Sequence, residues 1–320
     1  MTVGKLSPTD ANMQAILKNT LLAAYNAVHG KNDLKKMTST SIDIATRGDA
    51  VAGDAMIAYL KGVPQICKVY TEEQGEVILN EDGTYSAIID DIDGTKNFRE
   101  GLGMLPHGPI AGIFRGQDPR FKDCIVAGYL DFPSGNYVYA MKGHGCHVYE
   151  GFSRTSKPDP RMTRKLATTG RKELFIEGKN LTLLPDIYML GDLAPAFMEY
   201  SARAWLGDFR TTAAQLALVA AGSADIFVTA GDNAFNKNKI KMGEEIGPGW
   251  LLITEAGGAV VDWAGRDIRN ERIALGEKKP WHFIAAATPE LAKEFAEDIA
   301  KKPAIAAYMQ RKGLGALGDC

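Results

Sequence analysis

The chain has 320 residues, of which 45% are hydrophobic and 24% are charged, and its 37 basic residues nearly balance 39 acidic ones. That balance argues against a nucleic-acid-binding protein, which carries a basic excess, and no stretch has the ~20 apolar residues needed to span a bilayer. Four scattered cysteines and an N-terminus without the apolar core of a signal peptide predict a cytoplasmic protein that binds neither nucleic-acid polymers nor membranes.

The first half of the chain predicts two helices followed by a run of strands. One helix is expected from the Ser7–Asp10 cap to Gly30, and a second from about Asp49 to Lys61. Strands are predicted at 66–70, 85–89, 110–114, 124–130, 137–141 and 147–149, between clusters of Gly, Pro and Asp. This order is typical of a mostly antiparallel meander with two helices packed on it.

A polar, proline-containing segment at 151–165 marks the predicted domain boundary. We expect an N-terminal α+β domain at residues 1–155 and a C-terminal α/β domain at residues 156–320. In the second domain strands are predicted at 166–169, 224–228, 259–262 and 282–287, and helices at 211–221, 246–255 and from Thr288 to about Lys302.

Acidic residues concentrate where the strand at 85–89 ends, in the sequence Asp90-Asp91-Ile92-Asp93-Gly94-Thr95. Three carboxylates in four positions repel one another, and a bound cation such as Mg²⁺ relieves that repulsion with hard oxygen ligands. Gly94 permits close approach of the backbone to a ligand, and Thr95 opens the next helix, where free N–H groups attract anions. The alternative is an Asx turn with an acidic helix cap.

A second acidic pair, Glu72-Glu73, ends the strand at 66–70. If that strand neighbours the strand at 85–89, both acidic groups open on the same edge of the sheet, and Glu72 completes a metal site. Taken alone, the pair is more typical of a solvated turn.

Two families resemble the Asp90–Thr95 motif. The haloacid-dehalogenase-like phosphatases have D-x-D-G-T after an apolar strand, which would make Asp91 a covalent nucleophile. The other is the superfamily of inositol monophosphatase and fructose-1,6-bisphosphatase, whose pattern is an apolar pair followed by D-P-[IL]-D-G-[ST], with an E-E pair about twenty residues upstream. Here Asp91 stands where that pattern has proline.

The rest of the chain favours the second family, because further landmarks follow in its order. They are T-x-x-D at Thr46–Asp49, the Glu72-Glu73 pair, K-G-x-G at Lys142–Gly145 and E-A-G-G at Glu255–Gly258. The chain is therefore identified as a member of the inositol monophosphatase superfamily. The resemblance implies an α/β (α+β) fold, namely a layered αβαβα sandwich.

The resemblance also implies the roles of individual residues. Two or three Mg²⁺ ions would be held by Glu72, Asp90, the carbonyl of Ile92, Asp93 and Glu245, with Asp49 binding a further, weaker ion. Glu72, Thr95 and Asp49 would activate the attacking water, and Asp93, Gly94 and Thr95 would contact the substrate.

Two of these assignments, and the residue before Glu245, depart from the pattern or allow another interpretation. Glu245 is found by counting ten residues back from Glu255, and Glu244 then occupies a position that is usually tryptophan. Asp49 equally suits an N-cap of the second helix.

The implied reaction is hydrolysis of a small phosphomonoester by metal-activated water, with inositol monophosphate or fructose-1,6-bisphosphate as the type of substrate. Lys96 resembles the D-G-T-K motif of the 3′(2′),5′-bisphosphate nucleotidases, and Lys237, Lys239 and Lys241 lie in an insertion that suits either a second phosphate or a solvated loop. A catalytically silent metal-binding relative remains an alternative. The resemblance also implies a homodimer.

Overall fold

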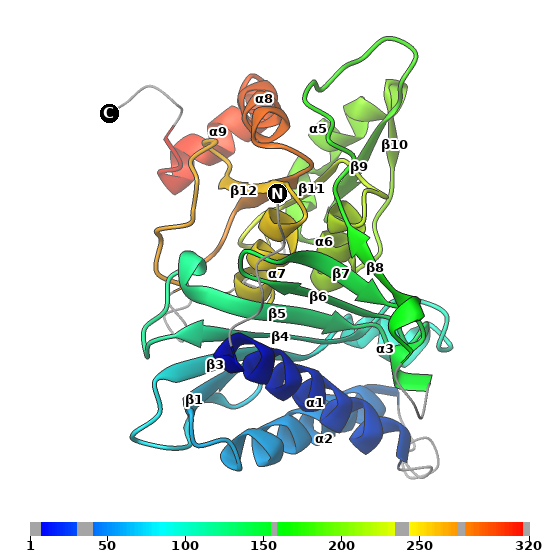
Figure 1. The fold of residues 1–320 in the computed structure, drawn as a ribbon. Helices are drawn as coiled ribbons and strands as arrows, with labels where there is room; N and C mark the ends of the chain where they lie inside the picture. Colours follow the sequence, from blue (N-terminus) through cyan, green and yellow to red (C-terminus); the bar gives the residue numbers. More distant parts are fainter. Residues whose placement is uncertain (1–7, 31–40, 155–158, 234–242, 274–278, 316–320) are drawn as a thin grey trace.

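Two β-sheets alternate with layers of helices in the computed structural model, which describes residues 8–30, 41–154, 159–233, 243–273 and 279–315. From bottom to top, Figure 1 shows α1 and α2, the first sheet, α6 and α7, the second sheet, and α8 with α9. This order confirms the predicted αβαβα sandwich.

The first sheet has eight strands in the order β2-β1-β3-β4-β5-β6-β7-β8. Only β1 and β3 pair in parallel; the other neighbours are antiparallel. The strands are β1 (Ile66–Thr71), β2 (Gly75–Ile78), β3 (Tyr85–Asp93), β4 (Gly108–Arg115), β5 (Cys124–Leu130), β6 (Tyr137–Met141), β7 (Gly145–Tyr149) and β8 (Thr163–Leu166). The predicted meander is therefore confirmed, and the parallel pair places the ends of β1 and β3 at the same edge.

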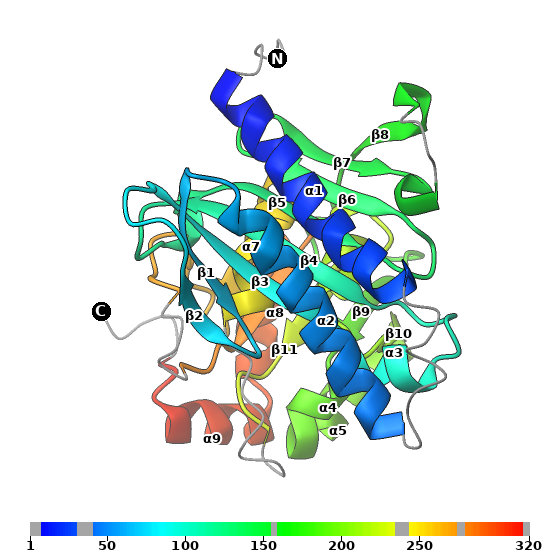
Figure 2. The ribbon, with the colours of Figure 1, turned by 90° about the horizontal axis from the view of Figure 1, so that it is seen from below.

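Different helices cover the two faces of this sheet. Helices α1 (Pro8–Gly30) and α2 (Ser41–Lys61) lie across one face, as Figure 2 shows from below. Helices α6 (Thr212–Ala220) and α7 (Gly243–Glu255) cover the other. Successive strand residues point to opposite faces, so Ile89 packs in the core with α1 and α2, whereas Ile88 packs in the core with α6 and α7.

The second sheet has the strand order β10-β9-β11-β13-β12. Its strands are β9 (Leu181–Pro185), β10 (Ala204–Leu206), β11 (Ile226–Thr229), β12 (Ala259–Asp262) and β13 (Phe283–Ala286). Phe227 and Phe283 face α6 and α7, and Val228 and Ile284 pack with the outer helices. Those helices are α4 (Ile187–Leu190), α5 (Ala194–Met198), α8 (Pro289–Ala300) and α9 (Pro303–Lys312). A further short helix, α3 (Thr95–Glu100), follows β3 of the first sheet.

Several predicted elements have different limits in the structure. Helix α2 begins at Ser41 rather than near Asp49, and β3 continues through Asp93. The strand predicted at 166–169 is wrong, because the strand found there, β8, ends at Leu166. Since β8 pairs with β7, the first sheet extends past residue 155. Helix α9 follows the one that was expected to be final. The domain boundary itself stays a prediction.

A single carboxylate joins two of the motifs noted in the sequence. Glu255, at the end of α7, accepts hydrogen bonds from the backbone N–H groups of Gly143 (2.7 Å) and Gly145 (2.8 Å) in the turn between β6 and β7. The E-A-G-G and K-G-x-G motifs thus contact each other. Their contact fixes α7, which carries Glu245, against the first sheet.

We expect Glu255→Ala to lower the free energy of unfolding by about 1–2 kcal/mol, because two backbone donors lose a charged acceptor. Glu255→Gln, which keeps one oxygen acceptor, should lose less. Chemical denaturation measures both. Glu271→Ala removes an exposed glutamate that pairs with Lys279 and is the matched control. A loss no larger than that of the control would contradict this role of Glu255.

Candidate metal and phosphate site

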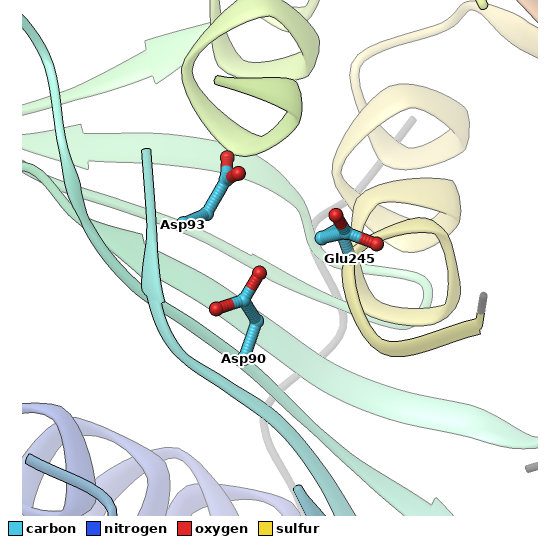
Figure 3. Close-up of side chains that lie close together, drawn as sticks. All are labelled: Asp90, Asp93 and Glu245. Carbon is cyan, nitrogen blue, oxygen red and sulfur yellow. The ribbon is translucent and has the colours of Figure 1, made fainter. Parts of the chain in front are cut away.

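Three buried carboxylates meet between the first sheet and α7. Asp90 and Asp93 come from β3 and Glu245 from the first turn of α7, and one oxygen of each lies within 4.8 Å of the others. Figure 3 shows the three side chains turned toward one another. The structure thus brings together three of the predicted metal ligands across more than 150 positions of sequence.

The end of β3 is shaped to present these groups. The pairing of β3 with β4 is irregular between Asp90 and Asp93. Asp93 Oδ2 then accepts hydrogen bonds from the hydroxyl of Thr211 and from the N–H of Ala213 (2.5 Å), at the start of α6. A carboxylate at a helix N-terminus is favoured electrostatically. Helix α6 therefore orients Asp93.

Gly94 follows Asp93 with φ +84°, in the left-handed region that favours glycine. A Cβ at this position would lie 3.2 Å from the carbonyl oxygen of Pro106, 3.2 Å from Cβ of Thr211 and 3.3 Å from Cβ of His107. Both the turn and the close packing therefore require glycine here.

The electrostatics of the site call for a cation. Burial raises the pKa of Asp90 well above its usual value, and the negative charges of Glu72, Asp93 and Glu245 raise it further. The charged groups that act most strongly on Asp90 are all negative. An all-oxygen, all-carboxylate donor set fits a hard divalent ion such as Mg²⁺. The residues present therefore suit the metal that the sequence predicts.

Glu72 lies beside this cluster but outside its tight core. It is exposed in the turn between β1 and β2, yet its charge raises the pKa of Asp90 and Asp49. Two hydrogen bonds from Gln74 stabilise this turn. Its backbone N–H donates to Thr71 Oγ1 (2.9 Å), and its side-chain amide donates to Asp54 Oδ1 (3.0 Å). Glu72 is therefore within electrostatic reach of the predicted metal ligands.

The expectation that Asp49 caps α2 is wrong. The helix begins at Ser41, so Asp49 lies two turns inside it. Its side chain is 6% exposed, and its pKa is raised to about 8 by burial and then by Glu73, Asp91 and Glu72, while a hydrogen bond with Thr95 lowers it. Asp49 therefore faces the acidic site.

Thr95 links the same region to the backbone of β3. Its hydroxyl donates to the carbonyl oxygen of Ile92 at 3.2 Å. Ile92 is buried, and its carbonyl lies between Asp90 and Asp93 in sequence. The predicted water-positioning hydroxyl and the predicted carbonyl ligand are thus neighbours.

Asp91 points to the opposite face of the sheet. Its carboxylate atoms lie 2.8–2.9 Å from where a Cβ of Gly53 on α2 would stand, so Gly53 provides its space. Asp91 is 2% exposed, and neither of its side-chain oxygens has a hydrogen-bond partner among the described residues. Burial, Glu73 and Glu72 raise its pKa to about 8. Asp91 is not part of the cluster of Asp90, Asp93 and Glu245. A covalent nucleophile acting at that site would have to be.

Glu244 is a buried acid whose importance the sequence did not reveal. It is 4% exposed, and its pKa is raised to about 8 by burial, then by Glu245 and Glu72. The sequence identifies Glu244 only as the residue at a position where the family pattern usually has tryptophan. The predicted helix at 246–255 leaves Glu244 outside it, whereas α7 starts at Gly243 and includes Glu244 in its first turn, where acidic residues are favoured.

The lysines of the predicted insertion, Lys237, Lys239 and Lys241, lie outside the described residues. Their proposed contact with a second phosphate stays a prediction. The roles assigned to Glu72, Asp90, Ile92, Asp93, Gly94, Thr95, Asp49 and Glu245 likewise stay predictions, although the structure gathers all of them around the end of β3.

Comparison with known proteins identifies relatives along nearly the whole chain. The model of the inositol monophosphatase family matches residues 5–303. A fructose-1,6-bisphosphatase/inositol-1-monophosphatase of Thermococcus kodakarensis is 26% identical over 268 residues, which are 83% of this chain and 87% of that protein. An inositol-1-monophosphatase of Mesorhizobium japonicum is 30% identical over 229 residues, 70% of this chain and 73% of that protein.

A solved structure supports the same grouping at the level of the fold. The inositol monophosphatase of Anabaena (Nostoc) sp. PCC 7120 superposes with a TM-score of 0.65 at 18% identity, over 94% of this chain and 100% of the other.

We expect Mg²⁺ to stabilise the protein more at pH 8.5 than at pH 6.0, because carboxyl ligands must lose their protons before they bind metal. The pKa of Asp90 is raised, and that of Asp49 is raised to about 8. The metal-free folded protein thus holds more protons than the unfolded chain, and its free energy of unfolding falls as the pH rises from about 4 through 8.

The rise in Tm caused by excess Mg²⁺ measures this effect at each pH. A monovalent salt of equal ionic strength is the control. A rise that is as large at pH 6.0 as at pH 8.5 would contradict the assignment of these carboxyl groups to a metal site.

Proposed function

We propose, since the chain belongs to the inositol monophosphatase family, that it is a Mg²⁺-dependent phosphatase that hydrolyses a small sugar or inositol phosphate. The observation that carries the proposal is the buried cluster of Asp90, Asp93 and Glu245, in which burial and then the negative charges of neighbouring carboxylates raise the pKa of Asp90. Such a cluster is stable only with bound cations or bound protons. A phosphatase of this kind requires cations there.

The proposed ligands divide between two or three ions. Asp90, Asp93, Glu245, Glu72 and the Ile92 carbonyl would hold them. Asp49 would assist a further, weaker ion. Mg²⁺ bound at these residues would neutralise the phosphate and lower the pKa of a coordinated water.

The chain's own groups would then move the proton and hold the substrate. Glu72, with Thr95 and Asp49 beside it, would orient the attacking water and accept its proton. The water oxygen forms the new bond to phosphorus as the bond to the leaving alkoxide breaks, so no phospho-enzyme forms. Asp93 and the backbone amides of Gly94 and Thr95 would position the phosphate oxygens.

The alternatives are supported less well. The haloacid-dehalogenase reading requires Asp91 to face the phosphate, but Asp91 packs against Gly53 on the other face of the sheet. A 3′(2′),5′-bisphosphate nucleotidase of the same superfamily remains a candidate, since Lys96 is exposed beside the site. A silent relative is disfavoured, because every predicted ligand position carries an oxygen donor.

The oligomeric state and the location of the protein are two further expectations. A homodimer, which the resemblance implies, and a cytoplasmic location, which the scattered cysteines predict, stay predictions. Among the described helices, none is both long enough and apolar enough to cross a membrane.

Hydrolysis assays test the proposed function directly. Purified protein should release phosphate from at least one of inositol-1-phosphate, fructose-1,6-bisphosphate and phosphoadenosine phosphate, with Mg²⁺ and not with EDTA. The absence of metal-dependent turnover on all three would overturn the proposal.

Substitutions at adjacent aspartates test the mechanism. Asp90→Asn and Asp93→Asn should each lower kcat by more than about 100-fold, because each removes a charge from the metal site. Asp91→Asn should retain much of the activity, since its side chain faces α2. An inactive Asp91→Asn variant, together with a phospho-aspartate trapped in the wild type, would instead indicate covalent catalysis.

A further inference from the structure

Two loops beside the site contain residues in an unfavourable backbone conformation. Leu102 has φ +52° and Arg210 has φ +55°, and these are the only non-glycine residues with positive φ in the described parts of the chain. Such strain persists only where the surrounding structure imposes it, and it gathers at functional sites. Both residues therefore call for a functional reason.

One buried amide holds the two loops together. The Asn97 side chain, on α3, donates to the carbonyl oxygens of Pro106 (2.9 Å) and Phe209 (2.6 Å). The first carbonyl belongs to the loop of Leu102, and the second belongs to the residue before Arg210. The loops thus form one unit at the end of β3, next to Gly94 and Thr95.

The backbone around Arg210 is fixed on three sides. Its own N–H donates to Asp208 Oδ1 at 2.8 Å, and the carbonyl before it is held by Asn97. The residue after it, Thr211, donates its hydroxyl to Asp93. Arg210 is therefore one residue away from the group that orients a proposed metal ligand.

The Arg210 side chain, in contrast, is exposed, and its charge acts on the carboxylates of Asp208 and Glu100 without forming an ion pair with either. Arg210, Lys96 and Arg99 all lie within electrostatic reach of Glu100, but only Arg99 forms an ion pair with it, at 2.5 Å. Within the described parts of the chain, no hydrogen bond or ion pair engages the charged end of Arg210 or Lys96. We call these two residues the basic rim.

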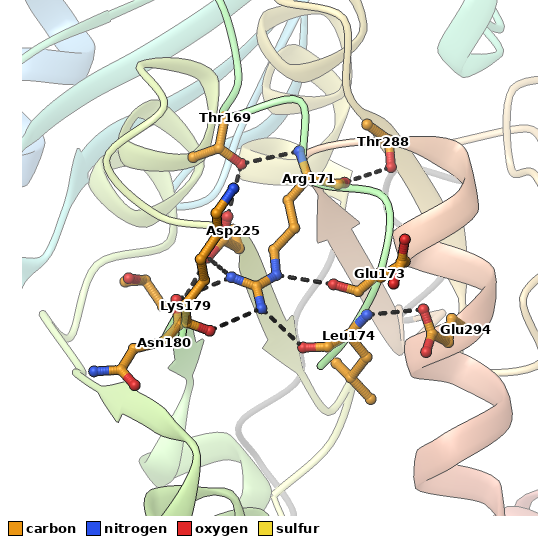
Figure 4. A network of polar contacts seen from close by, with 10 residues as sticks. Thr169, Arg171, Glu173, Leu174, Lys179, Asn180, Asp225, Thr288 and Glu294 are labelled. Carbon is orange, nitrogen blue, oxygen red and sulfur yellow. Dashed lines mark hydrogen bonds and ion pairs between the residues drawn. The ribbon is translucent and has the colours of Figure 1, made fainter. Parts of the chain in front are cut away.

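Arg171 illustrates the opposite case of a fully engaged arginine. Its guanidinium donates to the carbonyl oxygens of Glu173 (2.8 Å) and Asn180 (2.9 Å) and pairs with Asp225 at 3.7 Å. Figure 4 shows this network, which fixes a surface segment and leaves no donor for a ligand. Arg210 lacks any such structural task for its side chain.

We infer that Arg210, assisted by Lys96, binds a second anionic group of the substrate, so that the preferred substrate is a bisphosphate rather than a monophosphate. The inference rests on the proposed function, because the first phosphate would be bound at Asp93, Gly94 and Thr95. A guanidinium presents paired donors that match the oxygens of a phosphate. Its fixed backbone reduces the loss of freedom on binding.

Matched substrate pairs test the inference. The pairs are fructose-1,6-bisphosphate with fructose-1-phosphate, and phosphoadenosine phosphate with adenosine 3′-phosphate, each assayed with Mg²⁺. In the wild type, kcat/KM should favour the bisphosphate of at least one pair by about tenfold or more. Arg210→Ala should lower that ratio at least about tenfold, mainly through KM, and Arg210→Lys should lower it less.

Two measurements separate recognition of charge from a loss of structure. The preference of the wild type for the bisphosphate should fall as salt is added, while that of Arg210→Ala should change little. The matched control is Arg164→Ala on β8, which removes an exposed arginine paired with Glu150 at 2.9 Å. It should keep the wild-type ratio.

The possible failures are distinguishable. Equal kcat/KM for both members of each pair in the wild type, or a ratio unchanged in Arg210→Ala, would overturn the inference and leave the phosphatase intact. Wild-type protein that turns over inositol-1-phosphate but none of these four compounds would overturn the inference alone. The absence of turnover of inositol-1-phosphate as well would overturn the proposed function and this inference with it.

Discussion

The constraint on which the structure depends is the burial of like charges between β3 and α7. Asp90, Asp93 and Glu245 are each less than a tenth exposed, and removing each charge from water costs several kcal/mol without a partner. The surrounding contacts hold the carboxylates in place despite that cost. Thr211 and the start of α6 bind Asp93, and Glu255 fixes the far end of α7 to the first sheet.

The pleat of β3 gives neighbouring aspartates different surroundings. Asp90 faces α7 and belongs to the carboxylate cluster, whereas Asp91 faces α2 and takes the space left by Gly53. Proline in the family pattern needs no polar partner at this position, whereas the charge of Asp91 raises the pKa of Asp90 and of Asp49. Lys96 and Arg210, the basic rim, lie next in sequence to Thr95 and to Thr211, which orients Asp93.

The sequence predicts the position of the site because the acidic motif is local in the chain. It does not predict features that tertiary contacts determine. Asp90 and Asp93 follow from one motif after an apolar strand. Glu245 was reached only by counting from Glu255. The helical position of Asp49 was missed, since the first two turns of α2 carry no apolar periodicity strong enough to set its start. Nothing in the sequence indicates that Arg210 adopts a left-handed conformation, because glycine is the usual sign of one.

Mg²⁺ binding by the carboxylate cluster is the central claim, and isothermal titration calorimetry at pH 8 tests it most directly. The account predicts saturable Mg²⁺ binding to the wild type and a loss of at least about tenfold in affinity for Glu245→Gln, which keeps the shape of the side chain and removes its charge. Asp262→Asn, at an exposed ion pair with Arg266 on β12, should bind as the wild type does. No Mg²⁺ binding to the wild type, or equal binding by Glu245→Gln, would contradict the account.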